Sequence, residues 1–116
     1  MLRRVMLCEI GVDLVSINRF TQSMRKTPSM SSLIMHPSEL SLSLVAQAGN
    51  FAAKEALQKC LRTEKLDFSS IAVLRDTHGE PYFKEYKSLI LKNHKAKVSI
   101  TNELDFVIAF VVLINA

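Results

Sequence analysis

The stretch NFAAKEALQKCL, residues 50–61, predicts an α-helix, because Ala, Leu, Lys, Glu and Gln favour helices and no Pro interrupts them. Glu55 and Lys59 are four positions apart and therefore lie one above the other on a single face of that helix. Small side chains share this spacing on the adjoining face, where another backbone can approach closely: Ala48, Ala52 and Ala56. We expect this helix to be the element on which the rest of the chain packs.

The spacing of Glu55 and Lys59 leaves two interpretations open. Beside a surface of small side chains, a carboxylate and a lysine can hold a metal ion and an anionic group together. They can equally form a solvated ion pair, which is the commoner case for such pairs on helices. Spacing alone does not decide between a functional and a solvated pair.

The composition indicates one globular domain over residues 1–116. The chain is 48% hydrophobic and 22% charged, which excludes a disordered protein. Its net charge of +4 favours an acidic partner, such as nucleic acid, a phosphate ligand or an acidic protein. Aromatic residues make up only 7% of the chain, so few side chains can stack on bases and nucleic acid is the least favoured partner.

The cysteines and the apolar segments predict a cytoplasmic protein without a membrane anchor. Two cysteines, Cys8 and Cys60, cannot by themselves form a disulfide framework or a zinc site. The apolar run near the N-terminus stops at Glu9, which is too early for a signal sequence. The charge-free run at 106–114 is far shorter than a membrane span.

A strand predicted over residues 5–14 carries the first candidate functional residue. Gly11 within it permits a close approach of another backbone. Asp13 stands among apolar neighbours, where a buried carboxylate requires a metal, an arginine or a helix N-terminus as its partner. Asp is also a favoured N-cap, so the alternative is that Asp13 caps the next helix, predicted over residues 15–26.

The remaining elements follow from turn residues and hydrophobic patterns. Ser38 is a good N-cap, so the central helix is expected to run from there to about Arg62, thinned at Gly49. The continuously apolar run 106–114 is typical of a strand covered on both faces, which in so short a chain suggests subunit packing. The other expected elements are a loop at 27–32, a hairpin with strands 71–76 and 82–83 around a turn at 77–81, a helix at 85–94 and a strand at 97–102.

Several short motifs occur in an informative order and spacing. They are Gly-Val-Asp-Leu at 11–14, Ser-Glu-Leu at 38–40, Phe-Ala-Ala-Lys-Glu-Ala at 51–56 with Lys59, Asp-x-x-Gly-x-Pro-Tyr at 76–82, Val-Ser-Ile-Thr at 98–101 and Ala-Phe-Val-Val at 109–112. Together they resemble the holo-acyl-carrier-protein synthase family, the small bacterial 4′-phosphopantetheinyl transferases. The resemblance covers nearly the whole chain. It favours a functional role for Asp13 over a helix cap, and for Glu55 over a solvated ion pair.

The resemblance implies a fold and an activity in fatty acid biosynthesis. The fold is α+β, with a small antiparallel sheet packed on a long central helix, and family members form homotrimers with active sites between subunits. The activity is transfer of the 4′-phosphopantetheine group from coenzyme A to a serine of apo-acyl carrier protein, which releases adenosine 3′,5′-bisphosphate. Magnesium (Mg²⁺) is the implied cofactor, and coenzyme A and apo-acyl carrier protein are the implied partners.

The resemblance also implies roles for individual positions. Asp13 and Glu55 match the family's magnesium ligands, which suits a hard cation that takes a few carboxylates, waters and phosphates. Glu55 is the candidate for removing the serine proton, and Lys59 for steadying the transferring phosphoryl group with its charge. Arg19 matches a basic residue that contacts the acidic carrier protein. The positions implied to contact coenzyme A are Lys59, Thr63, Ser99 and Asn102.

The chain departs from the family pattern where the family contacts coenzyme A. Family members commonly have Arg where this chain has Asn50, His where it has Asn102, and a glycine in the loop at 62–65. The segment between 40 and 48 looks shorter and lacks the family's basic residues. These departures keep one alternative open, a non-catalytic relative that binds the carrier protein without modifying it. The positive charge alone keeps open a second, a small nucleic-acid-binding protein.

Overall fold

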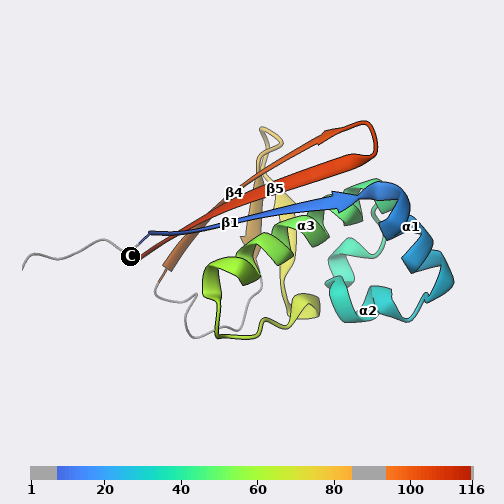
Figure 1. Cartoon of the computed structure of the whole chain (residues 1–116), viewed down its shortest axis with the longest axis horizontal. Helices are drawn as coiled ribbons and strands as arrows, with labels where there is room; N and C mark the ends of the chain where they lie inside the picture. Colours follow the sequence, from blue (N-terminus) through green and yellow to red (C-terminus); the bar gives the residue numbers. More distant parts are fainter. Residues whose placement is uncertain (1–7, 85–93, 116) are drawn as a thin grey trace, which may run out of the picture.

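Helix α3 (Leu44–Leu61) lies at the centre of the fold, and three long strands cross one side of it (Figure 1). The structure is a computed structural model that describes residues 8–84 and 94–115. The crossing strands form an antiparallel sheet in the order β1-β5-β4: β1 (Cys8–Ser16), β5 (Phe106–Asn115) and β4 (His94–Glu103). This small antiparallel sheet on a long central helix is the α+β arrangement that the sequence predicts.

The shorter elements complete the domain around α3. Helices α1 (Ile17–Lys26) and α2 (Met30–Ile34) lie together at one end of the molecule (Figure 1). Strands β2 (Ala72–Arg75) and β3 (Pro81–Lys84) form the predicted hairpin, whose turn places Gly79 at φ 83°, a conformation that favours glycine. Two single 3₁₀ turns are η1 (Pro37–Glu39) and η2 (Phe68–Ser70). No helix in residues 8–84 and 94–115 has the length and apolarity needed to cross a bilayer.

Strand β1 approaches α3 so closely that only glycine fits at position 11. A Cβ atom on Gly11 would lie 1.9 Å from the backbone oxygen of Ala56. The alanines on this side of the helix are fully buried: Ala48, Ala52, Ala53 and Ala56. The close backbone approach predicted from Gly11 and from the alanine spacing is therefore confirmed.

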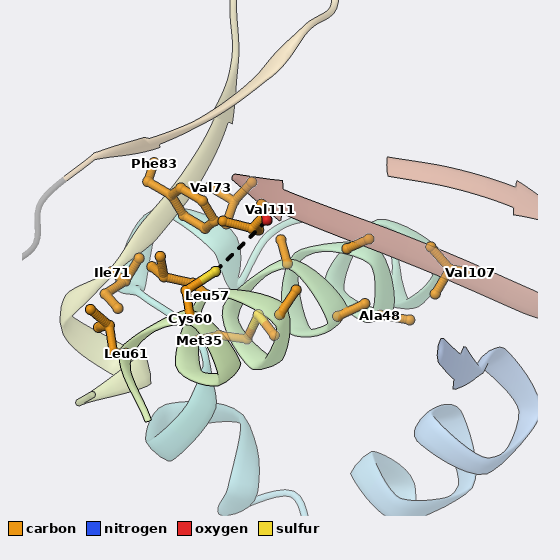
Figure 2. Close-up of a cluster of buried hydrophobic side chains, with 14 of the residues drawn as sticks. Met35, Ala48, Leu57, Cys60, Leu61, Ile71, Val73, Phe83, Val107 and Val111 are labelled. Atoms are coloured by element: carbon orange, nitrogen blue, oxygen red, sulfur yellow. Dashed lines mark hydrogen bonds between the residues drawn. The ribbon is translucent and has the colours of Figure 1, made fainter. Parts of the chain in front are cut away.

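The hydrophobic core surrounds α3 (Figure 2). Leu57 is completely buried, and Ile71 and Val73 at the β2 hairpin belong to the same cluster. Cys60 lies in this core, where its thiol donates to the carbonyl oxygen of Val111 over 3.7 Å. Cys60 and Cys8 are both free thiols, as the sequence predicts.

The predicted start of the central helix is wrong. Ser38 belongs to η1, where its hydroxyl lies 2.8 Å from the His36 ring nitrogen Nδ1. Helix α3 begins at Leu44 instead, because Ser43 takes the cap position and its hydroxyl accepts from the backbone N–H of Ala46. Two serines compete as caps in this segment, and local chemistry alone does not choose between them.

Other boundaries also differ from the predictions. Helix α2 occupies part of the stretch expected to be a loop at 27–32. Strand β1 extends to Ser16, beyond the predicted end at residue 14, while residues 5–7 lie outside the described part of the chain. The predicted helix at 85–94 also lies outside the described residues except for His94, which belongs to strand β4.

Within the described part of one chain, strand β5 is covered on one face only, and burial of its other face by subunit packing stays a prediction. The face toward α3 holds buried Val107, Ala109 and Val111. The other face of the sheet carries large apolar side chains that are 40–62% exposed: Ile10, Val12, Leu14, Phe106, Ile108 and Phe110. Register pairs these residues across β1 and β5, as Val12 with Phe110 and Leu14 with Ile108, so they form one continuous apolar face.

Candidate active site

Asp13 and Lys59 meet where strand β1 crosses α3. Asp13 pairs in register with buried Ala109, so its side chain lies on the helix-facing side of the sheet. The Lys59 ammonium lies 3.3 Å from Asp13 Oδ1 and donates to the carbonyl oxygen of Val12 over 2.7 Å. The Lys59 side chain is 55% exposed and that of Asp13 18%, so water and ligands can reach this pair.

Glu55 completes a cluster with these two residues. Burial raises the pKa of the Glu55 carboxyl, the Asp13 charge raises it further, and the Lys59 charge lowers it. Two neighbouring carboxylates that repel one another are the arrangement that a divalent cation relieves. Asp13 precedes Glu55 by 42 residues and Lys59 by 46. The crossing of β1 and α3 nevertheless brings the three side chains close together.

Glu55 also stands where two pockets meet. One pocket, of about 600 Å³, extends along the C-terminal end of α3 and is lined by Gln58, Thr63 and Lys65 among others. The second, of about 390 Å³, lies between β1, α1 and α3, and its lining includes Asp13 and Arg19. Both pockets share Glu55 and Ile34 in their linings. Thr63 and Arg19 therefore each line a pocket that also includes Glu55.

Two predicted contact residues, Ser99 and Asn102, are not brought to this cluster within one chain. They lie on β4, which the central strand β5 separates from β1 and Asp13. Ser99 pairs with Phe110 and so lies on the apolar open face, whereas Asn102 pairs with Val107 on the opposite side. Their predicted role therefore requires either a ligand that reaches across the sheet or a second copy of the chain.

The alternative interpretation of Asp13 as a helix cap is wrong. Ser16 caps α1, because its hydroxyl accepts from the backbone N–H of Arg19 over 3.2 Å. Asp105, in the β4–β5 turn, supports this cap by accepting from the Ser16 hydroxyl at 2.7 Å and from the Asn18 N–H at 2.9 Å. Asp13 is therefore available to Lys59 and to the smaller pocket, which Arg19 in the first turn of α1 also lines.

Sequence reasoning missed a buried ion pair that supports the pocket walls. Lys54, the neighbour of Glu55 in the Ala-Ala-Lys-Glu-Ala motif, contacts Glu39, and both side chains are completely buried. The Lys54 ammonium also donates to the carbonyl oxygens of Ile34 at 2.9 Å and Phe68 at 3.0 Å. Ile34 and Phe68 both line the larger pocket, so this pair fixes part of its wall. The sequence gives no local signal for this pair, because Glu39 precedes Lys54 by 15 residues and belongs to a different element.

Asn50, where the family commonly has Arg, belongs to the same network. Its side-chain N–H group donates to Glu39 Oε2 at 2.7 Å and to the carbonyl oxygen of Val73 at 3.2 Å. The backbone N–H of Val73 also donates to Glu39 Oε2. Asn50 therefore joins α3 to η1 and β2, and its side chain is not part of either pocket at Glu55.

The residues of the cluster suit magnesium better than a metal that needs an all-protein cage. In residues 8–84 and 94–115 no three His, Cys, Asp or Glu side chains group together as metal ligands. Mg²⁺ keeps several waters and is usually bound by one or two carboxylates together with substrate phosphates. Asp13 and Glu55 supply such a pair, and the repulsion that raises the pKa of Glu55 is an observation that fits it.

A carboxylate pair beside a lysine, with one of the carboxylates in the linings of two pockets, suits a phosphate ester and a divalent cation. The family comparison agrees: the model of the 4′-phosphopantetheinyl transferase superfamily matches residues 9–111. The chain belongs to this superfamily and, within it, to the holo-[acyl-carrier-protein] synthase family, as its relatives show. It is therefore an enzyme of the transferase class.

Three relatives illustrate this membership. The holo-[acyl-carrier-protein] synthase of Bacillus pumilus is 32% identical over 119 residues, which cover 93% of this chain and 96% of the relative. The solved structure of the Neisseria meningitidis synthase has a TM-score of 0.80 at 29% identity, covering 90% of this chain and 96% of that one. The Helicobacter pylori synthase, solved in complex with coenzyme A, has a TM-score of 0.78 at 30% identity, covering 90% of this chain and 98% of that one.

Proposed function

We propose that this chain transfers the 4′-phosphopantetheine group of coenzyme A to a serine of an apo-acyl carrier protein. The serine oxygen would bond to the phosphorus of the phosphopantetheine phosphate, and the bond from that phosphorus to the bridging oxygen would break. Adenosine 3′,5′-bisphosphate would leave. The observation that carries the proposal is that Asp13, Glu55 and Lys59 lie close together, with Glu55 in the linings of two pockets.

Asp13 and Glu55 would hold a magnesium ion in this reaction. When bound, the ion would neutralise the charge that develops on the pyrophosphate and the leaving group. Lys59 contributes a positive charge beside the same carboxylates, and as a point charge it suits a phosphoryl oxygen. The carbonyl oxygen of Val12 accepts from the Lys59 ammonium, which keeps the ammonium beside Asp13.

Glu55 is the candidate base for the serine proton, directly or through a water. Burial raises the pKa of Glu55, which makes it a stronger base than an ordinary carboxylate. The smaller pocket gives a serine on a partner protein access to Glu55 past α1, since Arg19 and Glu55 both line it. Proton removal and partner docking would thus occur at one opening.

The basic side chains of α1 support an acidic carrier protein as the partner. Arg19 lies in its first turn, and Arg25 and Lys26 lie in its last. All three are exposed, so they can face the carboxylates of a docked protein. Such contacts mainly raise the association rate, which makes binding sensitive to salt.

The open apolar face of the sheet supports assembly into a homotrimer. Exposed apolar patches of this kind mark interaction sites, and this one is continuous across β1 and β5. Ser99 pairs with Phe110 and lies on the same face, so it would belong to this interface. Replacing Phe110 with Lys should reduce the mass measured by light scattering from that of an assembly to that of one chain. An unchanged assembly mass would contradict this interface.

Intact-mass spectrometry of an apo-acyl carrier protein tests the proposed reaction. After incubation with this protein, coenzyme A and Mg²⁺, the carrier should gain one phosphopantetheine group. EDTA should abolish the gain, and added excess Mg²⁺ should restore it. A carrier that gains the group equally well in EDTA would contradict the metal assignment.

One observation favours a second candidate, a relative that binds the carrier protein without modifying it. Asn50 turns into the internal network and leaves the pockets at Glu55 without a side chain from that position. This candidate predicts no mass gain by a carrier that an established transferase does modify. It also predicts carrier binding without measurable coenzyme A affinity, which calorimetry would reveal.

A further inference from the structure

Arg75, the last residue of β2, directs its guanidinium at a buried amide. One terminal nitrogen, Nη2, donates to Asn50 Oδ1 over 3.2 Å, and Nη1 makes a long 3.5 Å contact with the carbonyl oxygen of Leu74. Arg75 forms no ion pair within the part of the chain that the structure describes. The guanidinium is thus held at one edge while the rest of its donors remain available.

The hydrogen bonds of Asn50 fix this geometry. Asn50 is only 1% exposed, and its N–H group is used by Glu39 and Val73, so its oxygen must face Arg75. The charge of Glu39 is already matched by Lys54 in the same network. Burial lowers the pKa of Arg75, with Glu39 offsetting part of the effect, so an anion at the guanidinium would be favourable.

The position of Asn50 separates this guanidinium from the Asp13–Glu55–Lys59 cluster. Asn50 precedes Glu55 by five residues on α3, which turns the two side chains about 140° apart around the helix axis. Arg75 also lines neither pocket at Glu55. An anion held by Arg75 would therefore be a different group from the phosphate at the carboxylate pair.

We propose that Arg75, positioned by Asn50, binds the ribose 3′-phosphate of coenzyme A. The inference rests on the proposed function and adds a specificity determinant to it. Coenzyme A carries this phosphate apart from the pyrophosphate, so the two anionic groups can occupy two separate sites. Arginine suits the role because its planar fork of donors matches phosphate oxygens. The enzyme would thereby distinguish coenzyme A from dephospho-coenzyme A.

Calorimetry with two nucleotides tests the proposal without requiring activity. Adenosine 3′,5′-bisphosphate carries the 3′-phosphate, and adenosine 5′-monophosphate lacks it. Arg75→Gln should weaken binding of the bisphosphate by about 10-fold to 100-fold, the value of a charge-assisted hydrogen bond, and leave the monophosphate within about 2-fold. Arg75→Lys should recover part of the loss. Lys84→Gln, which removes the same charge from exposed Lys84 on the partner strand β3, is the matched control and should leave both affinities unchanged.

Transfer assays separate failure of this inference from failure of the proposed function. If wild-type protein modifies the carrier, Arg75→Gln should raise the KM for coenzyme A to that for dephospho-coenzyme A and leave the KM for the carrier unchanged. Wild-type protein that modifies no carrier would contradict the proposed function, while the nucleotide affinities would still decide the role of Arg75. Equal weakening of both nucleotides, no weakening, or a change confined to the carrier KM would each overturn the 3′-phosphate assignment.

Discussion

Helix α3 contributes the lysine of two lysine–carboxylate pairs, one of which is buried and the other partly exposed. Lys54 and Glu39 are completely buried, and the lysine has three acceptors, of which two are backbone carbonyls. Lys59 and Asp13 are partly exposed and lie 3.3 Å apart, beside the further carboxylate of Glu55. The first pair has every donor satisfied inside the protein, whereas the second can exchange its partner for a ligand.

The difference shows that solvent accessibility and donors free to bind a ligand, rather than residue type, distinguish a functional pair from a structural one. A buried ion pair contributes to a defined geometry and is costly to break, because the surviving charge has no water. An exposed pair contributes little to stability, because water competes for both charges. We therefore expect the same substitution to lower mainly the stability at Lys54 and mainly the transfer rate at Lys59.

Replacing Lys54 with Met should have the largest effect on stability. The substitution leaves Glu39 buried without its cation, so the free energy of unfolding should fall by about 3–5 kcal/mol in urea titrations. Lys59→Met is the matched control on the same helix and should change it by less than about 1 kcal/mol. The control should nevertheless reduce phosphopantetheine transfer by about 100-fold, as expected for a charge at a reacting phosphate. Equal stability losses from the two substitutions would remove the distinction between the pairs.

Replacing Gly11 with Ala should damage the exposed pair and spare the buried one. The new Cβ would overlap the Ala56 backbone oxygen, so β1 must move away from α3 and carry Asp13 with it. Overpacking of this kind typically costs about 1–3 kcal/mol of unfolding free energy. Hydrogen exchange should show faster opening in β1 than in η1, where Glu39 lies. Unchanged stability would mean that β1 does not approach α3 as closely as the structure shows.

The sequence predicts the elements well where one local signal dominates. The alanine spacing and Gly11 predict the packing of β1 on α3, and Gly79 predicts the hairpin turn. The start of α3 fails because Ser38 and Ser43 are both acceptable caps, and only the wider packing selects Ser43. Such choices depend on contacts between segments that are distant in sequence.

In the candidate site, too, the features that depend on contacts between distant segments are those that the sequence does not predict. Asp13, Glu55 and Lys59 were identified through the family resemblance, and the structure brings them together. The motif gives no reason to separate Lys54 from Lys59, because their difference arises from Glu39 and from two distant carbonyl groups. For the same reason the link between Asn50 and Arg75 was not predictable, since it joins α3 to a strand 25 positions away.

Cys60 should give the smallest and most pH-dependent effect. Burial raises the pKa of its thiol from an ordinary 9.0 to about 11, so the thiol stays protonated to a higher pH than an exposed cysteine. Because the folded pKa is the higher one, its contribution to stability is fully present below pH 9 and is lost as pH rises toward 11. The difference between the wild-type and Cys60→Ala stability profiles should therefore decline over that range. A flat difference would contradict burial of the thiol.

The transfer activity of a Glu55→Gln variant decides whether the cluster of Asp13, Glu55 and Lys59 is the reaction site. Gln keeps the shape of Glu55 and removes its charge, and the raised pKa of Glu55 means that ionisation costs stability in the folded state. The unfolding midpoint of the variant should therefore be equal to or above that of wild type. Its transfer rate, followed by the mass of the carrier protein, should fall at least about 100-fold, since both a magnesium ligand and the base are lost. Near-normal transfer by a folded Glu55→Gln variant would contradict the assignment of this cluster as the reaction site.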